Sequence, residues 1–434
     1  MEWKGVFIMQ DTLLGLSEVE ITPTSPMETV GFGRIDNISR GVLHSLSSQI
    51  AIWQQGMERY CLITIDHIGF SKQDADMLRT QIGELLGVEK ERVMLCFSHT
   101  HSAPNTTVEQ EYFRFLCSQV LCGIKQALDH MVSVIAAWGN AYGDIGVNRR
   151  GVENALDRRI GLLKVMDAKT GELKLLVLRL TAHANVLKED NYLISPDYFG
   201  AVRDRIKAEY GCMAMVTQGA SGNIAPRYFK SKLTPSDVMD LQWFHRSEHA
   251  LSRMAEEVCT AIEKVIHNIH PHQIEHMRMY SFLMELQAAV PSYEHALSVA
   301  KEAMQYAGID GAEWLGEVRR LQKAGMKEQV DVIEVQYFAL DEGCLCGVAN
   351  EIMCEFALRA KEQLKNELFY LGGYTNGCTG YFPTEEEFTK GGFEVYWSML
   401  LYYKYYGRVY PLKRESASLF LEQVIANAPQ CILY

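Results

Sequence analysis

A chain of 434 residues with 48% hydrophobic and 22% charged residues has the composition of an ordinary globular protein, with enough apolar residues for a core. Its net charge of −12 argues against nucleic acid or an anionic membrane as the main partner, because phosphate binding requires an excess of Lys and Arg. The sequence contains no run of about 18 apolar residues, so no transmembrane segment is expected.

In the first two-thirds of the chain, strand-like and helix-like segments alternate. Short, apolar and β-branched runs predict strands at residues 60–65, 93–97, 132–138, 160–166, 172–180 and 213–217. Apolar residues at helical spacing predict helices at residues 74–86, 112–131 and 196–210. The turn sequence DAKTG at 167–171 joins two of the strands as a hairpin.

The middle of the chain is predicted to be mainly helical, and mixed elements follow it. Residues 235–327 are mainly amphipathic, with one strand near 277–287. A hairpin at 330–340 and 344–348, a helix at 352–363, a strand at 367–371 and a helix at 416–426 follow. We therefore predict an α/β fold, a mixed β-sheet core covered by helices. Residues 1–434 are expected to form one domain with a helical insertion at about 235–327.

The cysteines and the N-terminus bear on location. The 11 cysteines are scattered without a CxxC pair, and most stand among apolar neighbours, as small core residues do. So many free thiols favour a reducing compartment. The first residues lack the basic segment and apolar run of a secretion signal. We therefore expect a cytoplasmic protein.

The most reactive side chains follow the carboxyl ends of predicted strands, where ligands bind in open α/β sheets: Asp66, His99, His101, His183, Asn223 and Glu351. His99 and His101 are two residues apart, so both face one side of an extended segment, and imidazole is a preferred zinc donor. Taken singly, these residues have ordinary explanations. His183 fits a hydrogen-bonded loop, and Glu351, expected to begin the helix at 352–363, fits a partner of the helix dipole.

Short motifs occur around these residues in a fixed order. They are GLSEVEITP at 15–23, IDHIG at 65–69, SHTHSAP at 98–104, NRR at 148–150, SPDYFG at 195–200, QGASGNIAP at 218–226, NEIMCE at 350–355 and NGCTGYFPT at 376–384. Each motif is weak alone. Together and in this order, they make the sequence resemble the neutral/alkaline non-lysosomal ceramidase family along nearly its whole length. The resemblance implies the catalytic-domain fold of that family.

The resemblance also implies a site. Matched motif by motif, it assigns zinc to His99, His183, Glu351 and Tyr381, and contact with the substrate carbonyl to His101 and Arg149. Zinc polarises a carbonyl and activates water, so the implied activity is zinc-dependent hydrolysis of the amide bond of a small N-acyl substrate. Phenol oxygen is not a usual zinc donor, so Tyr381 is alternatively a wall of the pocket. Asp66 and Glu355 are the carboxylates considered for proton transfer, or else for orienting other groups.

Three departures from the family concern the substrate. Ala225 stands in place of a serine, Phe393 in place of a tyrosine, and residues 103–105 in place of a glycine-rich turn. The residues expected at the mouth of the site are mostly polar: Asn105, Thr106, Thr107, Glu109, Arg227 and Lys230. These features favour a small or charged N-acyl compound over long-chain ceramide. The competing hypothesis is that Met and Tyr side chains near residues 396–406 form a groove for a lipid, and it predicts that catalytic efficiency rises steeply with acyl length.

Three other functions stay open on sequence grounds. The same residues suit a zinc hydrolase of an ester or a cyclic amide, because the metal-water step is shared. True ceramide hydrolysis is a second alternative. A non-catalytic protein that binds a metal or ligand on an enzyme fold is the third. The sequence does not predict the oligomeric state.

Overall fold

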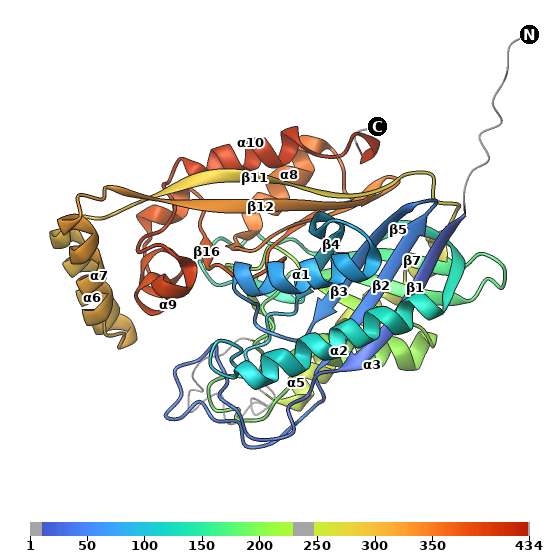
Figure 1. Ribbon diagram of the computed structural model, residues 1–434, viewed down its shortest axis with the longest axis horizontal. Coiled ribbons are helices and arrows are strands. Elements are labelled where there is room, and N and C mark those ends of the chain that lie inside the picture. The colour runs from blue at the N-terminus through green and yellow to red at the C-terminus, as the bar shows by residue number, and fades with distance from the viewer. Residues whose placement is uncertain (1–10, 229–246, 433–434) are drawn as a thin grey trace, which may run out of the picture.

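Two β-sheets pack face to face in the computed structural model, which describes residues 11–228 and 247–432, and helices cover both outer faces (Figure 1). Within these residues, the larger sheet has the order β4 (Val93–Phe97), β3 (Glu58–Ile65), β2 (Ser47–Gln55), β1 (Thr12–Glu20), β5 (Met131–Tyr142), β7 (Arg159–Asp167), β8 (Leu173–Leu180) and β9 (Met213–Gln218). The smaller sheet has the order β11 (Met277–Ala289), β12 (Glu328–Leu340), β13 (Gly343–Val348) and β15 (Phe369–Gly372). Both sheets mix parallel and antiparallel pairs.

Helices form the two outer layers. Over the larger sheet lie α1 (Lys72–Leu86), α2 (Gln110–Asp129), α3 (Asp197–Tyr210) and α5 (Glu248–Glu263). Over the smaller sheet lie α8 (Cys354–Leu364) and α10 (Ser416–Ala426). A further cluster, at the far end of β11 and β12 in Figure 1, contains α6 (Tyr293–Ala307), α7 (Ala312–Lys323) and α9 (Ser398–Tyr406).

Along the central strands of the larger sheet, alternate side chains pack against the helices and against the smaller sheet. In β2, Ile50 and Ile52 pack under the helices, whereas Ala51 and Trp53 pack against the smaller sheet. The Trp53 ring lies 5.9 Å from the ring of Phe338 in β12. Side chains alternate in direction along a strand, and here both faces are covered, so the middle of β2 is apolar at four successive positions, from Ile50 to Trp53.

Short elements connect the layers near the strand ends. They are β6 (Gly146–Asn148) paired with β10 (Ile224–Pro226), β14 (Glu351–Ile352) paired with β16 (Tyr381–Phe382), and the π-helix η5 (Phe393–Trp397). Short 3-10 turns complete the set: η1 (Lys90–Arg92), η3 (Ile266–Asn268), η4 (Glu386–Thr389) and η6 (Gln430–Ile432). The pairing of β14 with β16 is parallel and places Glu351 opposite Tyr381.

The predicted α/β class, with mixed sheet structure covered by helices, is confirmed, and most predicted elements lie within a few residues of observed ones. Strands β1 and β2 escape prediction because polar residues such as Glu18 and Gln49 interrupt their apolar runs. The expectation that Glu351 begins a helix is wrong. Glu351 lies in β14, and α8 begins at Cys354.

The helices predicted as one insertion over 235–327 lie in two places. In the described part of that range, α5 packs beside α3 on the larger sheet, whereas α6 and α7 lie beyond the ends of β11 and β12 (Figure 1). Residues 235–246 of the range lie outside the described residues. A single domain over 1–434 stays a prediction.

A buried ion pair ties α1 to the smaller sheet, and its loss should destabilise the fold. Arg79 is fully buried, and its Nη1 and Nη2 donate to Glu334 of β12 at 2.7 and 2.8 Å. We expect Glu334→Ala to lower the free energy of unfolding by about 3 kcal/mol, because it leaves a buried guanidinium without its main partner.

Urea unfolding followed by circular dichroism measures this effect. The control is Glu285→Ala, at an exposed position on the neighbouring strand β11, which should change the free energy of unfolding by less than about 0.5 kcal/mol. If both variants lost the same free energy of unfolding, the ion pair of Arg79 and Glu334 would have no specific role in stability.

Candidate metal centre

Histidines from two distant strands meet at one end of the larger sheet. His99 and His101 follow β4, and His183 follows β8. Gln218, at the end of edge strand β9, donates through Nε2 to the carbonyl of Ser98 after β4, at 3.2 Å. The two edges of the sheet therefore approach each other here, which brings the histidines together.

Glu351 lies between His99 and His183. Its Oε2 is 3.4 Å from Nε2 of His99 and 3.3 Å from Nε2 of His183. All three side chains are almost completely buried. His99 itself has a φ of 60°, a left-handed conformation that is uncommon for a non-glycine residue and is found at functional sites.

Backbone carbonyls set the orientation of each imidazole. Nδ1 of His99 lies 2.6 Å from the carbonyl of Ile68, and Nδ1 of His183 lies 2.7 Å from the carbonyl of Ser221. A carbonyl only accepts hydrogen bonds, so Nδ1 carries the proton and Nε2 presents its lone pair to the centre. This tautomer is the one in which a histidine binds a metal through Nε2.

His101 is oriented in the same way. Its Nδ1 lies 3.1 Å from the carbonyl of Gly31, and its buried Nε2 has no hydrogen-bond partner among the described residues. The ligand atoms of His99, His101 and His183 lie within 4.8 Å of one another. His101 is therefore at the centre, close enough to touch a group bound there.

Burial keeps His183 neutral, and neighbouring residues keep Glu351 charged. Burial, and next to it Arg149, lowers the pKa of His183 to about 4. Burial by itself would raise the pKa of Glu351, but the adjacent His99 and His183 hold that pKa well below its usual range. Neutral imidazoles and an ionised carboxylate are the forms that bind a metal cation.

Tyr381 and Arg149 occupy the side of the centre formed by β16. Nη2 of Arg149 donates to the Tyr381 hydroxyl at 3.1 Å and to the Gly222 carbonyl at 2.7 Å. Its Nε is 2.9 Å from Oε1 of Glu394. Tyr381 borders the cavity described below, whereas Arg149 lies behind it. Arg150 is engaged elsewhere, by Glu387 and Glu394.

The residues at this centre fit a zinc ion. Two imidazole nitrogens and a carboxylate oxygen, donors that zinc prefers, converge from fixed orientations. The buried Nε2 atoms of His101 and His183 make no hydrogen bond within the described part of the chain, so each has a lone pair available for a ligand. Tyr381 pairs with Glu351 across β14 and β16 and borders the same cavity.

The other two carboxylates considered for proton transfer lie away from the histidines. Asp66 is buried in an ion pair with Arg203 of α3, and it also accepts from the backbone nitrogen of Ser47 at 2.9 Å. Glu355 accepts from Nδ2 of Asn223 at 2.9 Å. Neither carboxylate borders the cavity. The geometry therefore suits both for orienting loops rather than for touching a substrate.

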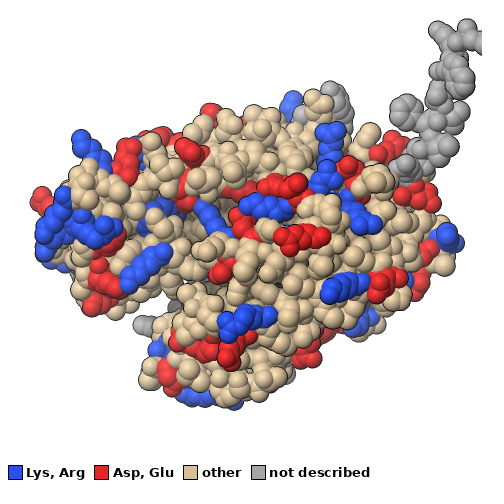
Figure 2. Space-filling model, in the orientation of Figure 1, with Lys and Arg blue, Asp and Glu red and all other residues tan. Residues whose placement is uncertain are grey.

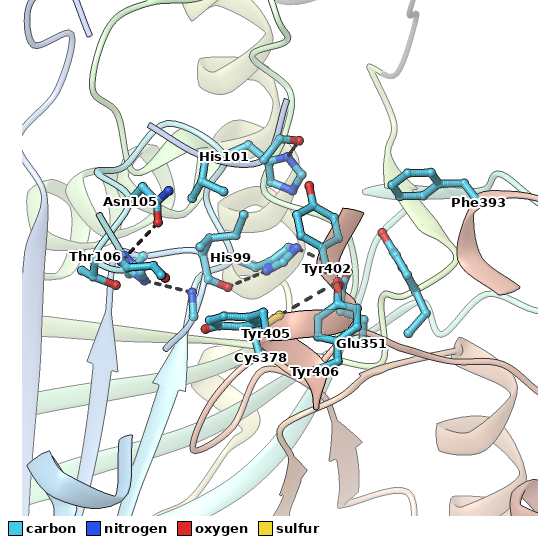
Figure 3. A pocket seen from close by; sticks show the side chains of 17 residues that line it. His99, His101, Asn105, Thr106, Glu351, Cys378, Phe393, Tyr402, Tyr405 and Tyr406 are labelled. Atoms are coloured by element: carbon cyan, nitrogen blue, oxygen red, sulfur yellow. Dashed lines mark hydrogen bonds and ion pairs between the residues drawn. The ribbon is translucent and has the colours of Figure 1, made fainter. Parts of the chain in front are cut away.

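A cavity of about 250 Å³ opens beside the histidines (Figure 3). Most of its surface is apolar or aromatic, and its lining includes His99, His101, Asn105, Thr106, Thr107, Glu351, Cys378, Tyr381, Phe393, Tyr402, Tyr405 and Tyr406. Of the polar residues expected at the mouth, Asn105, Thr106 and Thr107 are there. Glu109 instead accepts from the backbone of Glu28, Arg227 pairs with Glu257, and Lys230 lies outside the described residues.

The tyrosines of α9 and Cys378 are the residues that the motifs did not assign to the site. Tyr402, Tyr405 and Tyr406 recur at helical spacing, a signal that the sequence does contain, but core packing produces the same spacing. Sγ of Cys378 lies 3.9 Å from Oε1 of Glu351. The expectation of a mostly polar mouth is therefore corrected, because α9 makes one side of the cavity aromatic.

Solved structures of ceramidases share this fold. The chain superposes on the neutral ceramidase from Pseudomonas aeruginosa with a TM-score of 0.71 and 16% sequence identity, over 96% of this chain and 74% of the other. A ceramidase complexed with C2 gives a TM-score of 0.71 and 15% identity, over 98% of this chain and 75% of the other. No protein-family model matches the sequence. No curated protein matches it either.

The comparison with solved structures establishes the fold. The chain has the α/β fold of the neutral ceramidases, so the resemblance seen in the motifs is confirmed for the fold. At its strand ends this fold carries a candidate metal centre made of histidine and glutamate.

Proposed function

We propose that this protein is a zinc-dependent hydrolase that cleaves the amide bond of a small N-acyl substrate. The observation that carries the proposal is the convergence of the Nε2 atoms of His99 and His183 on one oxygen of Glu351, at 3.4 and 3.3 Å. The solved structures that share the fold are those of ceramidases. An ion held by His99, His183, Glu351 and Tyr381 would supply Lewis-acid activation of water and of the carbonyl.

The remaining residues of the centre have roles in this proposal. His101 acts on the substrate in this proposal: its buried Nε2, without a partner within the described ranges, would take up a proton and donate a hydrogen bond to the carbonyl oxygen of a substrate. Arg149 holds the Tyr381 hydroxyl at 3.1 Å and brings a positive charge to the same side. Donors aimed at a developing oxyanion contribute a few kcal/mol to catalysis. Asp66 keeps its place only as a positioning residue, through Arg203.

Removal and return of the metal test the proposal. We expect the purified protein to contain about one zinc per chain, the number that one set of four ligands holds. Dialysis against a chelator should abolish hydrolysis of N-acyl amides, and added zinc should restore it. The measurements are elemental analysis and release of free amine. A protein that hydrolyses amides equally well without metal would contradict the proposal.

The alternatives predict different results in the same assays. Faster cleavage of matched esters or cyclic amides than of linear amides would identify a zinc hydrolase that acts on esters or cyclic amides. Preference for ceramide would make this a ceramidase in activity as well as in fold. A protein that binds zinc and N-acyl compounds but turns over none would be a binding protein. The apolar cavity beside the histidines favours a substrate with an apolar acyl group.

We also propose a cytoplasmic location. The cysteines are all free, and most are buried. Unpaired thiols in this number persist in a reducing compartment. None of the described helices is both long and apolar enough to cross a membrane.

The face shown in Figure 2 intersperses Lys and Arg with Asp and Glu, which agrees with a small-molecule substrate rather than nucleic acid as the partner.

A further inference from the structure

The two faces of α9 serve different purposes. Tyr402, Tyr405 and Tyr406, here called the tyrosine wall, line the cavity beside His99 and Glu351 (Figure 3). On the opposite face, Leu400 and Tyr403 are buried in the cluster formed with α6 and α7. Residues three and four apart share one side of a helix, so the tyrosine wall is one continuous surface.

A buried ion cluster fixes α9 at its carboxyl end. Arg408 is 1% exposed, and its Nε lies 3.1 Å from Oδ2 of Asp331 in β12. Nζ of Lys72, at the start of α1, lies 2.5 Å from Oδ1 of the same carboxylate. Nε1 of Trp314 in α7 donates to the carbonyl of Val409 at 2.7 Å. The tyrosine wall is therefore held by three other elements of the fold.

The tyrosine wall also touches the loop that carries a candidate zinc ligand. Gly380 directly precedes Tyr381 and has a φ of 84°. A Cβ at Gly380 would lie 2.4 Å from the ring of Tyr406, so the ring packs directly on this backbone. A substrate whose carbonyl is at the metal centre would therefore place one of the two groups attached to that carbonyl against the tyrosine wall.

The size and lining of the cavity define what fits there. Its volume of about 250 Å³ is below the range of about 300 to 1,000 Å³ that is typical for pockets of drug-sized ligands. Phe393 adds a further ring, 6.0 Å from the ring of Tyr381. Aromatic rings pack favourably against one another with offset or edge contacts.

We propose that the tyrosine wall selects the acyl part of the substrate, admitting a compact apolar group of about the size of one aromatic ring and excluding long alkyl chains. This inference rests on the proposed function, because it names the substrate class of the same site. The three tyrosines are specificity residues in this proposal, and the ion cluster of Lys72, Asp331 and Arg408 positions them.

Hydrolysis of amides of one amine tests the proposal, with acetyl, phenylacetyl, octanoyl and hexadecanoyl groups compared by kcat/KM. We expect the phenylacetyl amide to exceed the hexadecanoyl amide at least about tenfold, the scale on which pocket shape discriminates substrates. Tyr402→Ala and Tyr406→Ala should reduce this ratio while zinc content stays unchanged. Leu401→Ala, at an exposed position on the same helix, is the matched control and should keep the ratio.

Calorimetric binding of phenylacetate and hexadecanoate to the zinc-loaded protein gives a second readout. We expect phenylacetate to bind more tightly, and Tyr402→Ala to weaken its binding. The proposed selection by the tyrosine wall would be wrong if the hexadecanoyl amide were hydrolysed fastest and the tyrosine variants left the ratio of the two kcat/KM values unchanged. That result would not contradict the proposed function. Failure to hydrolyse any amide would instead contradict the proposed function, and phenylacetate binding would still decide the role of the wall.

Discussion

Glu351→Gln is expected to remove zinc from the protein and to reduce amide hydrolysis to background. The substitution keeps the size of the side chain but takes away the charge that faces Nε2 of both His99 and His183 at 3.3–3.4 Å. A neutral amide is a poor zinc donor, so both the affinity and the geometry of the centre are lost. The activity loss should exceed the roughly 10- to 100-fold that follows loss of a group outside the ligand set.

Two measurements check this result independently of activity. The zinc content, measured by elemental analysis, should fall from about one zinc per chain towards none, because the site is a single set of four ligands. Added zinc should raise the melting temperature of the native protein but not that of the variant, since a ligand stabilises only a protein that binds it. The control is Glu362→Gln, at an exposed position in α8. Full zinc content in Glu351→Gln would exclude this carboxylate as a ligand.

Arg149→Ala is expected to lower kcat by roughly 10- to 100-fold while zinc content stays the same, which is the scale for losing a group that orients the residues of a metal centre. Arg149 reaches the centre through its hydrogen bond to the Tyr381 hydroxyl and lies behind that ring. Its removal therefore takes a positive charge from the side of the carbonyl without removing a histidine or the glutamate. Arg149→Lys should recover only part of the rate, because an ammonium cannot bond Gly222 and Tyr381 with the same planar geometry.

Arg158→Ala, at an exposed arginine nearby, is the control for charge alone and should leave both kcat and zinc unchanged. His101→Ala is the informative companion, since its Nε2 lies in the same 4.8 Å cluster as those of the proposed ligands. Retention of zinc with an activity loss of similar size would assign His101 to the substrate. Zinc loss in either variant would move that residue into the ligand set and contradict the assignment made here.

The sequence by itself predicted the fold class and most of the elements. Strand runs and helical spacing are local properties, and they remain visible in one dimension because each element buries an apolar face. The order of the motifs named His99, His183 and Glu351, whose side chains lie 3.3–3.4 Å from one another through Glu351. It also named Tyr381, which pairs with Glu351 across two short strands. Strands β1 and β2 were missed because their pattern is broken by polar residues.

Only the tertiary structure decided which reactive groups share the site. Asp66 and His99 both follow strand ends in the sequence, yet Asp66 is turned to Arg203, while His99 faces Glu351. The difference depends on the approach of the two sheet edges at Ser98 and Gln218, which no local pattern encodes. The aromatic wall of α9 was decided in the same way. Its tyrosines face a cavity rather than a core because Leu400 and Tyr403 already bury the other face against α6 and α7.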